Sequence, residues 1–321
     1  MKHGRLRIFA ALVFLAASAA TAAQSSGNRP MRVLVPVAPG GPSDTAIRLI
    51  VPQLSEALRR PIVVDNRPSA NGVAGTEIAA RANPDGLTLA IGNSGTHAIN
   101  ASLYRKLPYD PVNDFIPITE IVTSGLVLVA NPALPANSLQ DFVALAKKQH
   151  GKFNMGVAGA TGEIAGDALM VQTGIELKNV RYKGSSPTQI AVLSGEVQAT
   201  MLTPLATVSY LNTGKLKAFG ITSAQRSPVL PDLPTIAELG VPGYDFQIWH
   251  GLFAPAKTPT GVVRTMHREV IRVLADPGVK EQIAKQGAVI IGNTPEEFAA
   301  VIKSEIAKYR KIIMDNNLQI N

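Results

Sequence analysis

Short apolar runs alternate with segments of helical periodicity along most of the chain. The first run, 33–37, is rich in valine and leucine, which is typical of a buried parallel strand. After a turn with two glycines and two prolines, Ile47, Ile50 and Leu54 recur at the spacing of an amphipathic helix. A chain in which strands and helices alternate in this way is predicted to have an α/β fold.

Three successive strands are expected at 33–37, 61–65 and 87–91, and each ends in a loop rich in Gly, Ser, Thr or Asn. Because the carboxyl ends of parallel strands meet at one edge of a sheet, these loops can converge on one ligand. The first loop leads into a helix that Ser43 or Asp44 can cap, so it can aim backbone N–H groups at an anion. An ordinary strand-to-helix connection is the alternative interpretation of that loop.

Two apolar segments indicate that the chain passes into a second domain and back. The segment 116–129 is the expected first crossing, and 244–253, which contains the tryptophan of the chain, is the expected return. The predicted fold is therefore α/β with two lobes and two crossover segments, with a ligand cleft between lobes that close about a hinge. Lobe 1 is expected to comprise 24–123 and 249–321, and lobe 2 to comprise 124–248.

The first 23 residues have the pattern of a signal peptide. Lys2, Arg5 and Arg7 precede an apolar run at 8–17, and Ala20-Thr21-Ala22 fits a cleavage site after Ala22 or Ala23. A buried N-terminal helix is the alternative. The sequence thus predicts export to the periplasm, and the absence of cysteine excludes a cysteine-linked lipid anchor, disulfides and thiolate chemistry. The mature protein is expected to be soluble.

Charge and composition exclude several classes of partner. The formal net charge is +8, of which the predicted leader supplies three charges, and aromatic residues make up only 5%. No basic run interleaves with aromatic residues, so nucleic acid is not an expected partner. The five histidines are scattered without the spacing of metal ligands, so neither a metal nor a cofactor is expected.

Short motifs spread over nearly the whole mature chain resemble those of the Bug-type periplasmic solute receptors of the tripartite tricarboxylate transporter family. They occur in the family's order and spacing. The matching motifs are Pro39-Gly40-Gly41-Pro42-Ser43-Asp44, Asp65-Asn66-Arg67-Pro68, Pro84-Asp85-Gly86-Leu87-Thr88-Leu89, Asp114-Phe115-Ile116-Pro117-Ile118-Thr119, Tyr182-Lys183-Gly184-Ser185, Gly214-Lys215-Leu216, Arg226-Ser227, Leu230-Pro231-Asp232-Leu233-Pro234-Thr235, Pro242-Gly243-Tyr244 and Trp249-His250-Gly251-Leu252-Phe253-Ala254-Pro255.

This resemblance implies a two-lobed "Venus flytrap" that is not an enzyme. It would capture a small organic carboxylate, such as a di- or tricarboxylate or an aromatic acid, and deliver it to the membrane permease subunits. The receptor itself is expected to be a monomer. A carboxylate requires several aimed N–H and O–H donors, partly through water. The implied ligand-binding residues are Pro39, Gly40, Gly41, Ser43, Asp44, Ser94, Gly95, Thr96, His97, Ala158, Gly159, Thr161, Lys183, Ser185 and Thr203.

The sequence departs from the family pattern in two places, which leaves the substrate unassigned. Glu163 stands where a longer loop usually reaches a histidine, and Thr203 replaces the aspartate of a common Met-Phe-Asp triplet. Asp44 is expected to cap its helix or orient its loop rather than to touch an anionic ligand, and Trp249 to pack at the crossover. For Lys183, an exposed surface position is as plausible as a contact with the ligand.

Two other functions compete with transport. The receptor could report its ligand to a membrane signalling protein. Alternatively, Ser94 near His97 could belong to an exported hydrolase, although the stretch around Ser94 lacks the second glycine of a nucleophile elbow.

Overall fold

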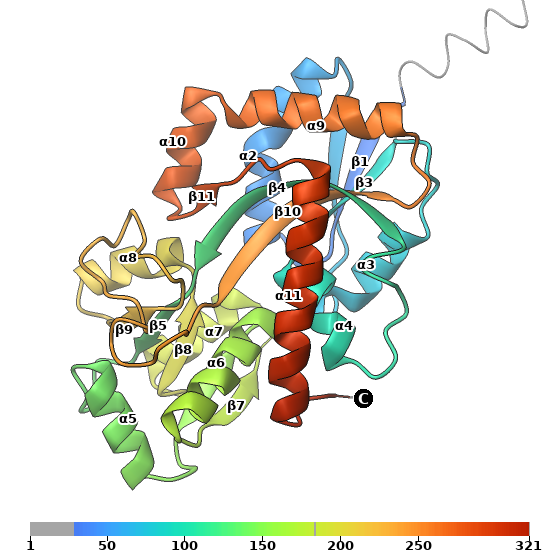
Figure 1. Ribbon diagram of the computed structural model, residues 1–321. Helices are drawn as coiled ribbons and strands as arrows, with labels where there is room; N and C mark the ends of the chain where they lie inside the picture. The colour runs from blue at the N-terminus through green and yellow to red at the C-terminus, as the bar shows by residue number, and fades with distance from the viewer. Residues whose placement is uncertain (1–28, 183, 321) are drawn as a thin grey trace, which may run out of the picture.

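The computed structural model describes residues 29–182 and 184–320, which form two β-sheets flanked by helices (Figure 1). The strands of the first sheet are β1 (Met31–Val35), β2 (Ile62–Asn66), β3 (Thr88–Asn93), β4 (Phe115–Gly125), β10 (Gln247–Pro255) and β11 (Val289–Ile290). Those of the second sheet are β5 (Val127–Ala130), β6 (Asn154–Val157), β7 (Lys178–Arg181), β8 (Ala199–Leu202) and β9 (Lys217–Ile221). The strand orders are β11-β4-β10-β3-β1-β2 and β7-β6-β8-β5-β9.

The prediction of three parallel strands at the start of the chain is confirmed. β1 lies between β2 and β3 and pairs in parallel with both. Their carboxyl ends therefore lie at one edge of the first sheet, where the loop 36–41 follows β1. β10 runs antiparallel to its neighbours β3 and β4, so both sheets are of mixed direction.

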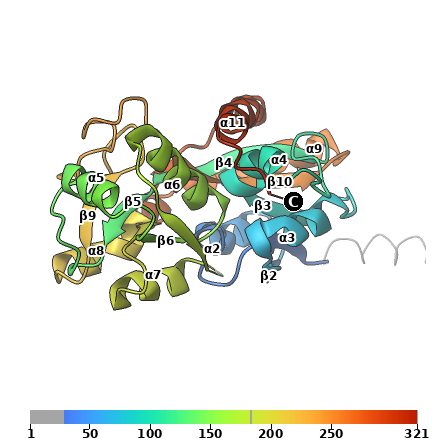
Figure 2. The ribbon, with the colours of Figure 1, turned by 90° about the horizontal axis from the view of Figure 1, so that it is seen from below.

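The chain passes between the sheets twice, as the fold prediction required. β4 leads through Leu126 directly into β5, and the segment 222–246 returns the chain from β9 to β10. The resulting two lobes lie side by side when the molecule is seen from below (Figure 2). The lobe boundaries stated above, at 123/124 and 248/249, stay a prediction.

Helices cover both sheets. The α-helices are α2 (Pro42–Ala57), α3 (Val73–Ala80), α4 (Asn100–Leu103), α5 (Leu139–Lys148), α6 (Ala160–Thr173), α7 (Ser185–Ser194), α8 (Pro204–Asn212), α9 (Thr260–Leu274), α10 (Pro277–Lys285) and α11 (Pro295–Asp315). Two further turns are η1 (Ala70–Gly72), a 3₁₀ turn, and η2 (Gly95–Ile99), a π-helical turn. Although Pro52 cannot donate a backbone hydrogen bond, α2 continues through it for five more residues.

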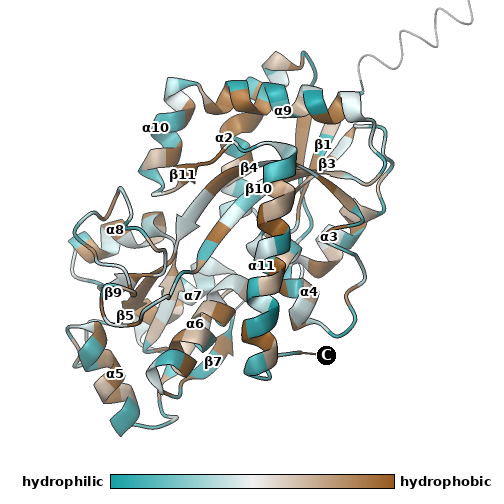
Figure 3. Ribbon diagram, viewed as in Figure 1, coloured by the Kyte–Doolittle hydropathy of each residue, from teal (hydrophilic) through white to brown (hydrophobic). Residues whose placement is uncertain are grey.

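Apolar side chains at helical spacing hold the outer helices on the sheets. On α9 the buried residues are Val263, Met266, Val270, Val273 and Leu274, which recur every three or four positions. Hydropathy along α9 alternates accordingly between polar and apolar residues (Figure 3). One hydrophobic cluster joins the lobes, since it contains Leu34 and Phe253 of the first sheet together with Leu128 and Met155 of the second.

The predicted signal peptide lies outside the described residues. Within residues 29–182 and 184–320, no helix is both long and apolar enough to cross a membrane.

Candidate ligand-binding site

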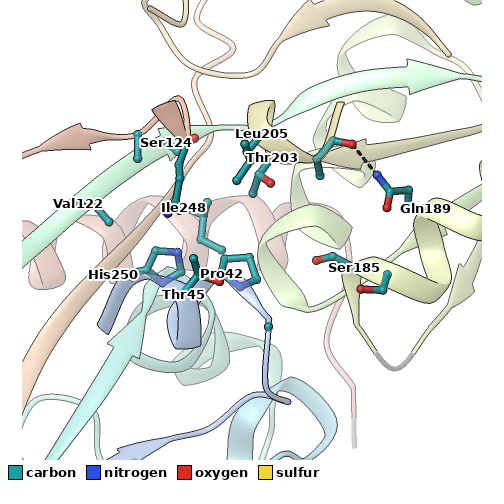
Figure 4. Close-up of a pocket in the computed structure, with 16 residues that line it drawn as sticks. Pro42, Thr45, Val122, Ser124, Ser185, Gln189, Thr203, Leu205, Ile248 and His250 are labelled. Carbon is teal, nitrogen blue, oxygen red and sulfur yellow. Dashed lines mark hydrogen bonds between the residues drawn. The ribbon is translucent and has the colours of Figure 1, made fainter. Parts of the chain in front are cut away.

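A cavity of about 180 Å³ lies where the two lobes meet (Figure 4). Its base is formed by β4 and β10, on which Ile248 pairs with Ser124 and His250 with Val122. Because alternate residues of a strand point to the same face, these four side chains share the cavity face of the sheet. Trp249 points to the other face, where its indole N–H donates to a glutamate of α11 at 2.9 Å. The tryptophan therefore packs the crossover and does not reach the cavity.

Three helices begin at the wall of this cavity. The lining residues near their starts are Pro42, Thr45 and Ala46 of α2, Ser185, Ser186 and Gln189 of α7, and Thr203, Leu205 and Ala206 at the start of α8. None of these helices has a side-chain hydrogen bond at its N-cap, whereas α5, α10 and α11 are capped by Ser138, Asp276 and Thr294. Pro42 and Pro204, the first residues of α2 and α8, have no backbone N–H. The backbone donors left without a side-chain cap are therefore those of the residues after these prolines and those of Ser185 and Ser186 in α7. A helix N-terminus attracts negative charge, so three of them favour an anion here.

A buried carboxylate braces the glycine loop that precedes α2. The Asp44 side chain accepts hydrogen bonds from the Gly40 backbone N–H, from Arg48 and from Asn66, each at 2.9 Å. Burial alone would raise the pKa of Asp44, but these hydrogen bonds and the Arg48 charge outweigh it and lower the pKa below its usual value. Asp44 therefore orients the loop, and its oxygens are occupied by protein donors. Gly40, at φ +79°, adopts a conformation that favours glycine.

Charged side chains are absent from the cavity wall among the described residues. The titratable group that lines it is His250, and burial lowers the pKa of this histidine to about 4. The ring is therefore neutral near pH 7. Electrostatic attraction for an anion comes from the helix ends rather than from a counter-ion. In the described part of the chain, no group of three or more His, Cys, Asp or Glu could hold a metal ion.

The segment Ser94–His97, expected to be a hydroxyl-rich loop, is instead fully buried, and from Gly95 on it forms the start of η2. The Ser94 hydroxyl lies 2.9 Å from the Thr161 hydroxyl at the start of α6, so this pair joins the two lobes directly. His97 stacks on Phe253 with ring centroids 3.9 Å apart, and burial lowers the pKa of His97 to about 3. Its Nδ1 atom contacts Thr96. Since Ser94 bonds to Thr161 rather than to a histidine, no nucleophile–base pair exists at this position.

The second-lobe loop 158–162 faces the same buried turn. Ala160 and Thr161 lie near Gly95, where an added Cβ would come within 3.7 Å of each. Glu163, which stands where the family pattern has a histidine, forms an ion pair with Arg181. The loop therefore serves the contact between the lobes, beside the cavity rather than in its wall.

The structure divides the predicted site residues into three groups. Gly40, Ser185 and Thr203 line the cavity, and Pro39, Gly41, Ser43 and Asp44 belong to the same loop and helix start. Ser94, Gly95 and Thr161 lie at the neighbouring contact between the lobes, and Thr96, His97, Ala158 and Gly159 adjoin these residues in the chain without lining the cavity. Lys183 lies outside the described residues. A direct contact of any of these residues with a ligand stays a prediction.

Several lining residues were not anticipated from the sequence. They are Thr45, Ala46, Val122, Ser124, Ser186, Gln189, Leu205, Ala206, Ile248, His250, Gln286 and Ala288. The segment around Trp249 carried one usable signal, because a large buried residue in a strand implies that its two neighbours, Ile248 and His250, face the opposite side. No comparable local signal marks Gln286 or Ala288, which reach the cavity from the loop before β11.

The chain is similar in sequence and in fold to known proteins of one family. A model of the tripartite tricarboxylate transporter family receptor matches residues 46–318. Protein BugT of Bordetella pertussis is 31% identical over 98% of each chain.

Solved structures agree with this match. An R. palustris protein with adipate superposes with a TM-score of 0.86 and 32% identity, over 90% of this chain and 97% of that one. MatC from Rhodopseudomonas palustris with bound malate gives a TM-score of 0.84 and 31% identity, over 89% and 99% of the two chains.

Proposed function

The chain belongs to the tripartite tricarboxylate transporter family of receptors, and we propose that it captures a small organic carboxylate between its lobes and delivers it to a permease of that transporter class. It is a periplasmic solute-binding receptor and not an enzyme. The observation that carries the carboxylate proposal is the convergence of three uncapped helix N-termini on one cavity. A carboxylate placed there would accept hydrogen bonds from backbone N–H groups, so its binding would not require a charged side chain.

The solved relatives support this class of ligand. One holds adipate and another malate, and both compounds are dicarboxylates. In this chain the cavity contains hydroxyl and amide groups of Thr45, Ser124, Gln189 and Thr203 beside apolar side chains. The groups of Thr45, Ser124 and Gln189 already donate to backbone carbonyls, whereas the Thr203 hydroxyl has no hydrogen-bond partner among the described residues. The Thr203 hydroxyl can bind the remainder of a ligand directly, and water can bridge the ligand to the others. Binding measurements are needed to identify the particular acid.

The lobes would close over the ligand by bending at the two passages between the sheets. The base of the cavity lies on β4 and β10, next to these passages, while α2 belongs to the first lobe and α7 and α8 to the second. A ligand that binds both walls stabilises the closed arrangement, because it gains contacts that the open arrangement lacks. The closed receptor is then the form that the permease would recognise.

A thermal-shift screen of the refolded mature chain, from Gln24, tests the carboxylate proposal. Refolding removes any ligand that co-purifies with the protein. At a concentration one hundred times its Kd, a true ligand adds about 2.7 kcal/mol to the free energy of unfolding. We expect a raised Tm with one or a few acids among mono-, di- and tricarboxylates and aromatic acids, and no shift with neutral analogues.

A cavity-filling variant locates the site. In Ser185→Leu the larger side chain would enter the cavity at the start of α7, so the shift produced by the acid should disappear. Ser209→Leu, at an exposed position near the end of α8, is the matched control and should keep it. If a correctly folded wild-type chain showed no shift with any acid, the carboxylate proposal would be wrong.

The hydroxyl pair between the lobes should contribute to ligand affinity by stabilising the closed form. We expect Ser94→Ala and Thr161→Val each to weaken binding of the acid found in the screen about fivefold, because a net hydrogen bond contributes about 1 kcal/mol. Isothermal titration calorimetry measures the Kd values. The double variant should lose no more than either single variant, since both remove the same bond. Losses that multiply to about twenty-five-fold would show that the two hydroxyls act independently.

A further inference from the structure

A chain of buried hydrogen bonds runs from β3 to the base of the cavity. The Asn93 side-chain oxygen accepts the backbone N–H of Thr96 at 3.0 Å. The amide nitrogen of Asn93 therefore faces the other way, where it lies 3.1 Å from the Ser43 hydroxyl. That hydroxyl lies 3.1 Å from Nδ1 of His250. Asn93, Ser43 and His250 are all buried.

The direction of these bonds assigns the proton on His250. A backbone N–H can only donate, so the Asn93 oxygen is fixed as an acceptor and its amide group donates to Ser43. Among the described residues, the Ser43 hydroxyl has no hydrogen-bond partner other than Asn93 and His250, so its single proton is directed to the acceptor that remains, His250 Nδ1. A neutral imidazole that accepts at Nδ1 carries its proton at Nε2. The ring is neutral, since burial lowers the pKa of His250 to about 4.

The remaining N–H of the ring meets the cavity. His250 lines the cavity on the same face of the sheet as the apolar residues Val122 and Ile248, and the wall near it also includes Thr45 (Figure 4). Among the described residues, no atom forms a hydrogen bond with Nε2 of His250. An N–H that faces the cavity without a protein acceptor requires one from the ligand or from water, and leaving it without one is unfavourable.

We propose that His250 is a specificity-determining residue that donates from Nε2 to an oxygen atom of the ligand, with Ser43 and Asn93 as the residues that hold its tautomer. This rests on the proposed function. This N–H can donate to a carboxylate, hydroxyl or carbonyl oxygen at that end of the ligand. It disfavours an ammonium group, which would place two donors against each other, and a methyl group, which would leave the N–H unpaired. The ligand class is thus a carboxylic acid with an oxygen acceptor at its other end.

Three probes of equal chain length separate these cases: adipate, 6-aminohexanoate and hexanoate. They end, respectively, in an oxygen acceptor, an ammonium donor and a methyl group. We expect the wild type to bind adipate at least about tenfold more tightly than the other two, because a hydrogen bond to a charged acceptor is lost with each. In His250→Phe the adipate affinity should fall about tenfold, while hexanoate affinity stays within about twofold.

Conservative variants distinguish a donor at Nε2 from mere packing. The side-chain amide of glutamine reaches the position of Nε2 and that of asparagine the position of Nδ1, so His250→Gln should recover part of the adipate affinity and His250→Asn should not. Ser43→Ala should weaken adipate binding without changing hexanoate binding. It removes the hydroxyl that donates to Nδ1 of His250, so the proton of the ring is no longer held at Nε2. His267→Gln is the matched control, since His267 contacts a backbone carbonyl outside the cavity and should leave all three affinities unchanged. Equal losses for adipate and hexanoate in His250→Phe would overturn the proposal.

Nitrogen NMR of the ligand-free wild type gives a direct readout of the tautomer, with the His250→Gln spectrum used for assignment. A proton on Nε2 supports the proposal, and a proton on Nδ1 overturns it. This measurement also separates the two proposals. If no acid bound to the wild type, the carboxylate function would fail, while the NMR result would still decide the state of His250.

Discussion

Replacing Thr203 by aspartate, the residue of the common family triplet, is expected to weaken binding of an acid whose carboxylate lies at the start of α8 about a hundredfold, which corresponds to about 2.8 kcal/mol. Relatives that carry this aspartate would then hold the carboxylate elsewhere in the cavity. Thr203 lines the small cavity as the N-cap residue of α8, so the new charge would lie within a few ångströms of an anionic ligand. Two unit charges 4 Å apart repel by about 4 kcal/mol at an effective dielectric constant of 20, and the helix ends offset part of this. Calorimetric Kd values at pH 7 for the acid found in the screen measure the loss.

The same substitution should not harm the fold, which makes the effect interpretable. Thr203 forms no capping hydrogen bond, and aspartate is at least as good an N-cap residue as threonine. The Tm of the ligand-free Thr203→Asp variant should therefore be unchanged or slightly raised. Thr203→Asn is the neutral control of the same shape and should bind within about threefold of the wild type. Equal losses in the aspartate and asparagine variants would mean that charge is not the cause, and that the anion does not lie near Thr203.

Replacing Gly92 by alanine is expected to destabilise the protein by about 3 kcal/mol. Gly92 lies in β3, and a Cβ built there would lie 2.3 Å from Nδ1 of His97 and 2.6 Å from a ring carbon of Phe253. These rings cannot move aside easily, because they stack on each other and Phe115 packs against the His97 edge. The free energy of unfolding from urea titration, followed by circular dichroism, measures the change.

Gly261→Ala is the control for this substitution. Gly261 lies in the first turn of α9 with no atom within 4 Å of an added Cβ. Alanine is favoured over glycine in a helix, so this variant should be as stable as the wild type or about 0.5–1 kcal/mol more stable. If Gly92→Ala lost less than about 1 kcal/mol, the aromatic packing around His97 would be looser than the structure indicates.

The order and type of most elements could be predicted from the amino-acid sequence alone. Apolar β-branched runs such as 33–35 form strands because only burial on both faces accommodates them, and amphipathic segments such as 260–274 form helices over those sheets. The glycine loop before α2 was also predictable, since its composition restricts it to a turn. Motifs spread along the chain identified the family, which the match over residues 46–318 confirms.

Only the tertiary structure decided which side chains meet at the cavity. Local composition indicated a polar loop at Ser94–His97, but packing against Phe253 and α6 buries this segment as a π-helical turn. Conversely, the only local signal for His250 was its neighbour Trp249, whose burial implied that His250 faces the other side of the strand. His250 reaches the cavity because the pairing of β10 with β4 places alternate residues on one face, and because α2 brings Ser43 against its ring. Strand register and interlobe packing depend on residues far apart in the chain, so no local pattern encodes them.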